Sequence, residues 1–84
     1  MLLRLVVKRT AAAPEASRTT VNFDSCGAPA VGDDVTVVHP VKKRSLTVAV
    51  DSMPTWMDPA TGAGYDVTVT AVADAGADYD AWVA

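Results

Sequence analysis

The chain has 84 residues, a formal net charge of −3 and 50% hydrophobic residues. This length suits one small domain, residues 1–84, with a thin core that buries roughly 60–65% of the unfolded surface. The single cysteine cannot form an internal disulfide, which excludes the disulfide-stapled secreted class. Arg4 interrupts an N-terminal apolar run that is too short for a signal peptide, and no stretch approaches the ~20 apolar residues of a membrane span. We therefore expect a soluble protein, cytoplasmic or part of a virion, with no membrane contact.

Hydrophobic and polar residues alternate along five segments of the chain. These segments are 3–8, 18–23, 35–38, 46–50 and 66–71. Such alternation is typical of half-buried antiparallel strands, and the abundance of Val and Thr also favours strands. Stretches rich in glycine, proline and aspartate separate the segments. The sequence therefore predicts an all-β fold: a small antiparallel barrel or sandwich of about five strands, of SH3-like or OB-like size, with little or no helix.

The connections differ in length and character. Residues 10–17 are expected to form a connection that holds at most a single helical turn, and residues 25–33 are expected to form a loop. Residues 51–64 form a long loop, and loops of this length are usually functional or packed on the domain. Residues 73–84 lose the alternation and are interpreted as a C-terminal tail.

The third and fourth predicted strands form the most regular hairpin. Pairing Val37 with Leu46 keeps both side chains on the inner face. This register places His39 opposite Arg44 and leaves residues 40–43 as a four-residue loop, in which proline suits the second position of a type I turn.

Charge is divided unevenly along the chain. All seven Lys and Arg residues precede residue 45, and six Asp residues follow it. Lys42, Lys43 and Arg44 should form a protruding basic tip. One alternative is therefore a small nucleic-acid-binding or regulatory barrel that uses this tip. The negative net charge and the threonines on outer strand faces weigh against it. A further alternative is a small acidic inhibitor protein.

Part of this charge division is expected to cancel inside the fold. If the first and last long strands are neighbours, Arg4 and Lys8 would lie near Asp66.

The sequence contains no arrangement of residues that indicates catalysis. His39 is the only histidine, Cys26 has no companion ligands, and no catalytic triad or glycine-rich phosphate loop is present. The aspartates near the C-terminus lack the glycine turn and distal glutamate of a calcium loop. We therefore expect a protein that is not an enzyme and that uses no metal, cofactor or small-molecule substrate.

The long loop and the tail hold the candidate interface residues. These are Met53, Trp56, Met57, Tyr79 and Trp82. Tryptophan and methionine are enriched at protein-binding surfaces. The alternative for Trp56 is that it covers an open end of the barrel and enlarges the core. The aromatic residues of the tail present the same choice, because they either pack onto the domain or add to a neighbouring sheet.

These observations favour an assembly subunit that acts by protein contacts. The partner would be another protein or a second copy of the chain, and the charge division would orient the contact. Size, strand pattern and the absence of catalytic motifs suit a structural component of a larger multimer, such as a phage virion protein of the decoration or tail-connector type.

Overall fold

The computed structural model describes residues 1–12 and 18–84, and strands are the main secondary structure in them. The strands are β1 (Leu2–Lys8), β2 (Arg18–Asp24), β3 (Asp34–Val38), β4 (Ser45–Val50), β5 (Thr55–Trp56) and β6 (Val67–Ala73). A short 3-10 helix, η2 (Pro59–Thr61), lies in the long loop, and one α-helix, α1 (Gly76–Val83), ends the chain. The helical turn predicted within 10–17 lies partly outside the described residues. The all-β class is confirmed.

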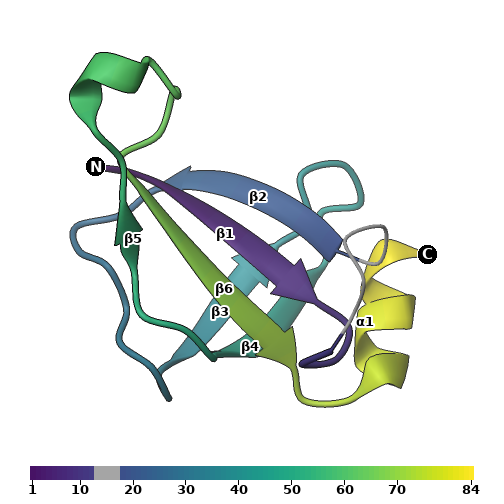
Figure 1. Ribbon diagram of the computed structural model, residues 1–84. Helices are drawn as coiled ribbons and strands as arrows, with labels where there is room; N and C mark the ends of the chain where they lie inside the picture. The colour runs from purple at the N-terminus through teal and green to yellow at the C-terminus, as the bar shows by residue number, and fades with distance from the viewer. Residues whose placement is uncertain (13–17) are drawn as a thin grey trace.

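The strands form one curled sheet that makes a half-barrel (Figure 1). Its order is β2-β1-β6-β4-β3, and β5 pairs with β6 outside this path. Four of the five strand pairs are antiparallel, but β1 and β6 are parallel, with Leu3 beside Val67 and Val7 beside Ala71. The expectation of a purely antiparallel sheet was therefore wrong at this pair. Alternation along a strand reveals which face is buried, and it carries no information on the direction of a neighbour distant in sequence.

The core lies inside the curl of the sheet. Alternate residues of β1 and β6 are fully buried, including Leu5 and Val69, each 0% exposed. Most of these side chains are small, as the composition predicts. Tyr79 and Trp82 of α1, 6% and 2% exposed, add the large aromatic surface that the strands lack.

The C-terminal segment is a helix that covers one end of the half-barrel (Figure 1). Tyr79 and Trp82 are three residues apart, so they lie on one helix face. The Trp82 indole N–H donates to the Arg44 carbonyl oxygen at 2.8 Å, and the Tyr79 hydroxyl lies 2.8 Å from the Thr19 hydroxyl. The aromatic side chains of the tail therefore pack onto their own domain rather than add to a neighbouring sheet.

The β3–β4 hairpin has the predicted register. Val37 pairs with Leu46, and the His39 backbone N–H donates to the Arg44 carbonyl at 2.8 Å. The His39 ring stabilises the turn, because its Nδ1 accepts hydrogen bonds from the backbone N–H groups of Val41 and Lys42 at 3.1 and 3.0 Å.

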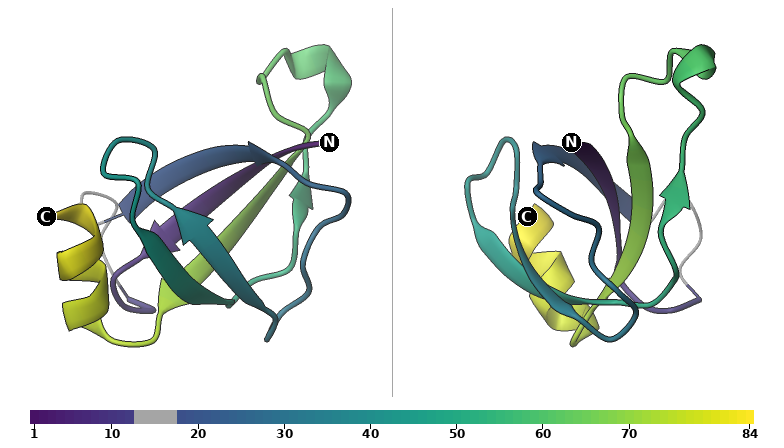
Figure 2. Two further views of the ribbon diagram at one scale, coloured as in Figure 1. Left: turned by 180° about the vertical axis from the view of Figure 1, so that it is seen from behind. Right: turned by 90° about the vertical axis from the view of Figure 1, so that its left-hand side faces the viewer.

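The half-barrel leaves an open side. β2 and β3 are the two ends of the strand order, so each has an edge that is not paired with another strand of the described sheet (Figure 2). Within the described residues, the helices are too short to cross a membrane.

Candidate protein-interaction site

The long loop predicted at 51–64 is a projection with its own structure. We call residues 52–64 the arm. At its base the chain follows the edge of β6: the Asp51 backbone N–H donates to Thr70 at 3.2 Å, and the Met57 N–H donates to Asp66 at 2.9 Å. Between these two points β5 pairs with the start of β6. The rest of the arm, with η2, extends away from the body of the molecule (Figures 1 and 2).

The arm presents large apolar side chains to solvent. Met53 is 78% exposed and Trp56 is 59% exposed, whereas Met57 is partly buried. Trp56 therefore does not cover the barrel end, which α1 occupies instead. A tryptophan held at the surface on an edge strand offers a partner both an apolar ring and free backbone groups.

Local hydrogen bonds and glycines shape the outer part of the arm. Asp58 caps η2, because its Oδ1 accepts from the Ala60 N–H at 2.9 Å. The Thr61 hydroxyl donates to the Asp58 carbonyl oxygen at 2.8 Å. Gly62 and Gly64 have φ of 65° and 81°, in the left-handed region that favours glycine, and they return the chain to β6.

The base of the arm is fastened to β1. The Arg4 guanidinium donates to the Tyr65 hydroxyl at 2.9 Å and lies 5.1 Å from the centre of its ring. Hydrogen bonds from Arg4 and Thr68 lower the pKa of the Tyr65 hydroxyl. Asp66 accepts a hydrogen bond from the Leu2 backbone N–H at 2.8 Å. These contacts attach the residues that directly follow the arm to β1.

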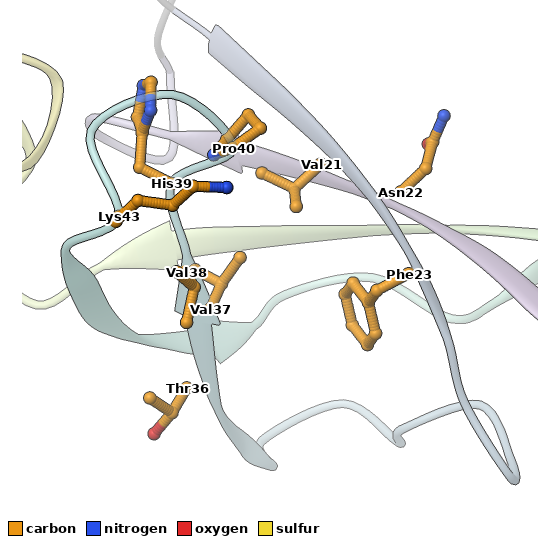
Figure 3. Close-up of a pocket in the computed structure, with 9 residues that line it drawn as sticks. All are labelled: Val21, Asn22, Phe23, Thr36, Val37, Val38, His39, Pro40 and Lys43. Carbon is orange, nitrogen blue, oxygen red and sulfur yellow. The ribbon is translucent and has the colours of Figure 1, made fainter.

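A second surface feature is an apolar slot on the open side of the half-barrel. It lies between β2 and β3, has a volume of about 400 Å³ and is lined chiefly by Val21, Phe23, Val37, Val38 and Pro40. Figure 3 shows the side chains of Val21, Phe23 and Val37 between the two strands. Val21 and Val37 belong to the core, as the alternation predicts. The slot beside them is not predictable from the sequence, because alternation does not show whether two end strands meet.

The basic tip is only partly free. Lys42 and Lys43 are exposed, whereas the Arg44 guanidinium donates to the Ala81 carbonyl oxygen of α1. Lys43 also lines the slot (Figure 3). It is the one non-glycine residue of positive φ within residues 1–12 and 18–84, with φ of 60°.

Lys8 at the end of β1 and Arg9 directly after it form ion pairs with acidic residues of the same chain. Lys8 is 8% exposed and pairs with Asp51, while Arg9 pairs with Asp80 at 3.0 Å. The expectation that β1 lies beside the last long strand is confirmed. Lys8 was expected near Asp66, but it forms an ion pair with Asp51 instead. Two of the residues that could extend the basic tip into a wider patch, Arg4 and Lys8, are thus engaged in contacts within the chain.

The predicted interface residues thus divide into two groups. Met53, Trp56 and Met57 lie together on the arm, whereas Tyr79 and Trp82 are buried under α1 and belong to no exposed surface. Across the described part of the chain, His, Cys, Asp and Glu side chains form no cluster that would hold a metal ion. Comparison with protein-family models, curated proteins and solved structures finds no match.

Proposed function

We propose that the protein is a non-enzymatic assembly subunit that binds its partner through the arm. The observation that carries this proposal is the exposure of Trp56 and Met53 on a shaped projection. Tryptophan is enriched among the residues that dominate binding energy at protein interfaces. A structural component of a larger multimer, such as a virion decoration or tail-connector subunit, is the class that this proposal favours.

The local structure of the arm supports a role in binding rather than that of a flexible connecting loop. The cap on η2 and the Arg4–Tyr65 contact order the arm before any partner arrives. A pre-ordered segment loses less conformational entropy on association, which favours affinity.

The use of His39 supports a role without catalysis. Its Nδ1 accepts two backbone hydrogen bonds in the β3–β4 turn, and its ring packs edge-on against Trp82 at 4.9 Å. These contacts give the ring a structural task, and a general base must instead reach a substrate proton.

Affinity capture from the cells that make the protein tests this proposal. Three tagged baits are compared: the wild type, Trp56→Ala, and Val41→Ala as a control. Val41 is 75% exposed, so the control also removes an exposed apolar side chain, at a site away from the arm. We expect one protein, or untagged copies of the chain itself, to be retained by the wild type and the control and lost with Trp56→Ala. Identical retention by all three baits would contradict the proposal.

A further inference from the structure

The slot and the arm are complementary in chemistry. The slot is a largely apolar pocket with Lys43 at its margin. Its lining residues belong to β2, β3 and the turn that follows β3. The arm carries exposed apolar side chains next to one carboxylate, that of Asp58. A volume of about 400 Å³ falls within the range of sites that enclose small organic groups, which suits an indole ring.

The two features lie on different sides of one molecule. In the right-hand view of Figure 2 the β3–β4 hairpin and the arm occupy opposite sides of the molecule. The residues that line the slot include none from 52–64. A chain therefore cannot place its arm in its own slot in this fold, and the arm must come from another molecule.

We propose that the slot receives the arm of a second copy of this chain, with Trp56 between β2 and β3 and Asp58 beside Lys43. The inference rests on the proposed function, because it uses the same arm and names its partner. The Trp56 ring contacts the partly exposed Phe23 and the exposed Val38 and Pro40, and burial of this apolar surface drives the association.

Charge sets the direction of this contact. Lys42 and Lys43 are exposed, and neither forms an ion pair with a residue that the structure describes. One carboxylate oxygen of Asp58 caps η2, and the carboxylate forms no ion pair with a described lysine or arginine of its own chain. Opposite charges at the margin of an apolar contact favour one orientation and raise the rate of encounter.

The contact joins two different surfaces, so it is heterologous. Repetition of such a contact gives a ring if the rotation closes and an open filament if it does not. Each junction involves one tryptophan and a short strand edge, which is less than a standard stable interface. We therefore expect a weak junction, with a dissociation constant on the order of 10–100 μM.

Light scattering of the pure full-length chain tests the inference. We expect the mean mass of the wild type to rise between about 10 μM and 1 mM. Trp56→Ala removes the arm anchor, and Val38→Glu places a charge on the slot, where Val38 is 49% exposed. Each should weaken association at least about 30-fold. The matched controls, Val41→Ala and Val31→Glu, alter exposed valines that do not line the slot and should associate like the wild type.

A mixture of the two defective variants gives the sharpest outcome. Trp56→Ala keeps an intact slot, and Val38→Glu keeps an intact arm. The mixture can therefore form one intact junction, and we expect dimers of one copy of each variant and nothing larger. A mixture that remains monomeric would overturn the inference.

The charged pair is tested separately. Asp58→Asn keeps the cap, because asparagine is also a good N-cap residue, and Lys43→Asn suits the positive φ at this position. Each should weaken association a few-fold and reduce its salt dependence, and the double variant should be no weaker than the stronger single effect. Additive effects would overturn the pairing of these two side chains.

Two further outcomes separate this inference from the proposed function. If Val38→Glu associates like the wild type while Trp56→Ala does not, the arm is an interface but the slot is not its receptor, and the inference fails alone. A wild type that is monomeric up to about 1 mM also overturns the inference, and arm-dependent capture of a different protein would still support the proposed function.

Discussion

Lys8 carries the one buried charge that the described residues contain, and Asp51 is its partner. Burial alone raises the pKa of Asp51, but hydrogen bonds from Lys8 and Thr70 outweigh it, so the pKa lies below its usual value of 3.8. A carboxylate whose folded pKa is lowered stabilises the fold above its unfolded pKa. That contribution disappears as the pH falls through the folded pKa.

Asp51→Asn should lower the free energy of unfolding at pH 7 by about 2 kcal/mol, because the Lys8 ammonium keeps its burial and loses its counter-charge. The wild type should lose this advantage as the pH falls below about 4, so the variant should show a shallower dependence on acid. Urea unfolding at several pH values measures both effects. Asp58→Asn, an exposed carboxylate on the arm, is the control and should change stability little. Equal stability of wild type and Asp51→Asn at pH 7 would contradict this account.

Among the elements, the sequence pattern did not indicate α1, nor the short β5 and η2 within the predicted long loop. A helix of eight residues with two inward aromatic side chains gives too short a periodic signal to separate from a tail. The small Val and Ala side chains of the sheet leave one end of the half-barrel uncovered. Trp82 of α1 packs there, and its side chain is 2% exposed.

Truncation of the two tryptophans should change stability by very different amounts. Trp82→Ala should reduce the free energy of unfolding by about 3–5 kcal/mol, because it removes a fully buried ring and its hydrogen bond to Arg44. Trp56→Ala should change it by less than about 1 kcal/mol, because the ring is 59% exposed. Chemical unfolding followed by circular dichroism compares them. A large loss of stability in Trp56→Ala would show that this side chain serves the core.

Strand positions were readable from the sequence because alternation and turn residues report local geometry. The β3–β4 register followed from keeping Val37 and Leu46 on one face, and the arm was recognisable as an unusually long loop with Trp56. The sequence did not predict the direction of β1 relative to β6. It also did not predict the slot between β2 and β3. Both depend on how distant strands meet, which local periodicity does not encode.

At the scale of the whole molecule, part of the division of charge along the chain is neutralised by ion pairs within the chain. Lys8 pairs with Asp51 and Arg9 pairs with Asp80, so basic residues from the start of the chain meet acidic residues from its second half. The two lysines at the hairpin tip and the carboxylate of the arm are exposed and take part in neither ion pair. They are among the charges available to orient a contact between molecules.

If the arm binds the slot of another copy, as we propose, both surfaces must respond together when molecules associate. A dilution series of amide NMR spectra, from about 1 mM to 10 μM, tests it most directly because every backbone position reports at once. We predict that amides of β5 and of the two strands that line the slot, near Val21 and Val37, shift or broaden together as concentration rises. Amides of the loop around Val31 should stay constant. Spectra that do not change with concentration, or changes in the arm without changes in β2 and β3, would contradict the claim.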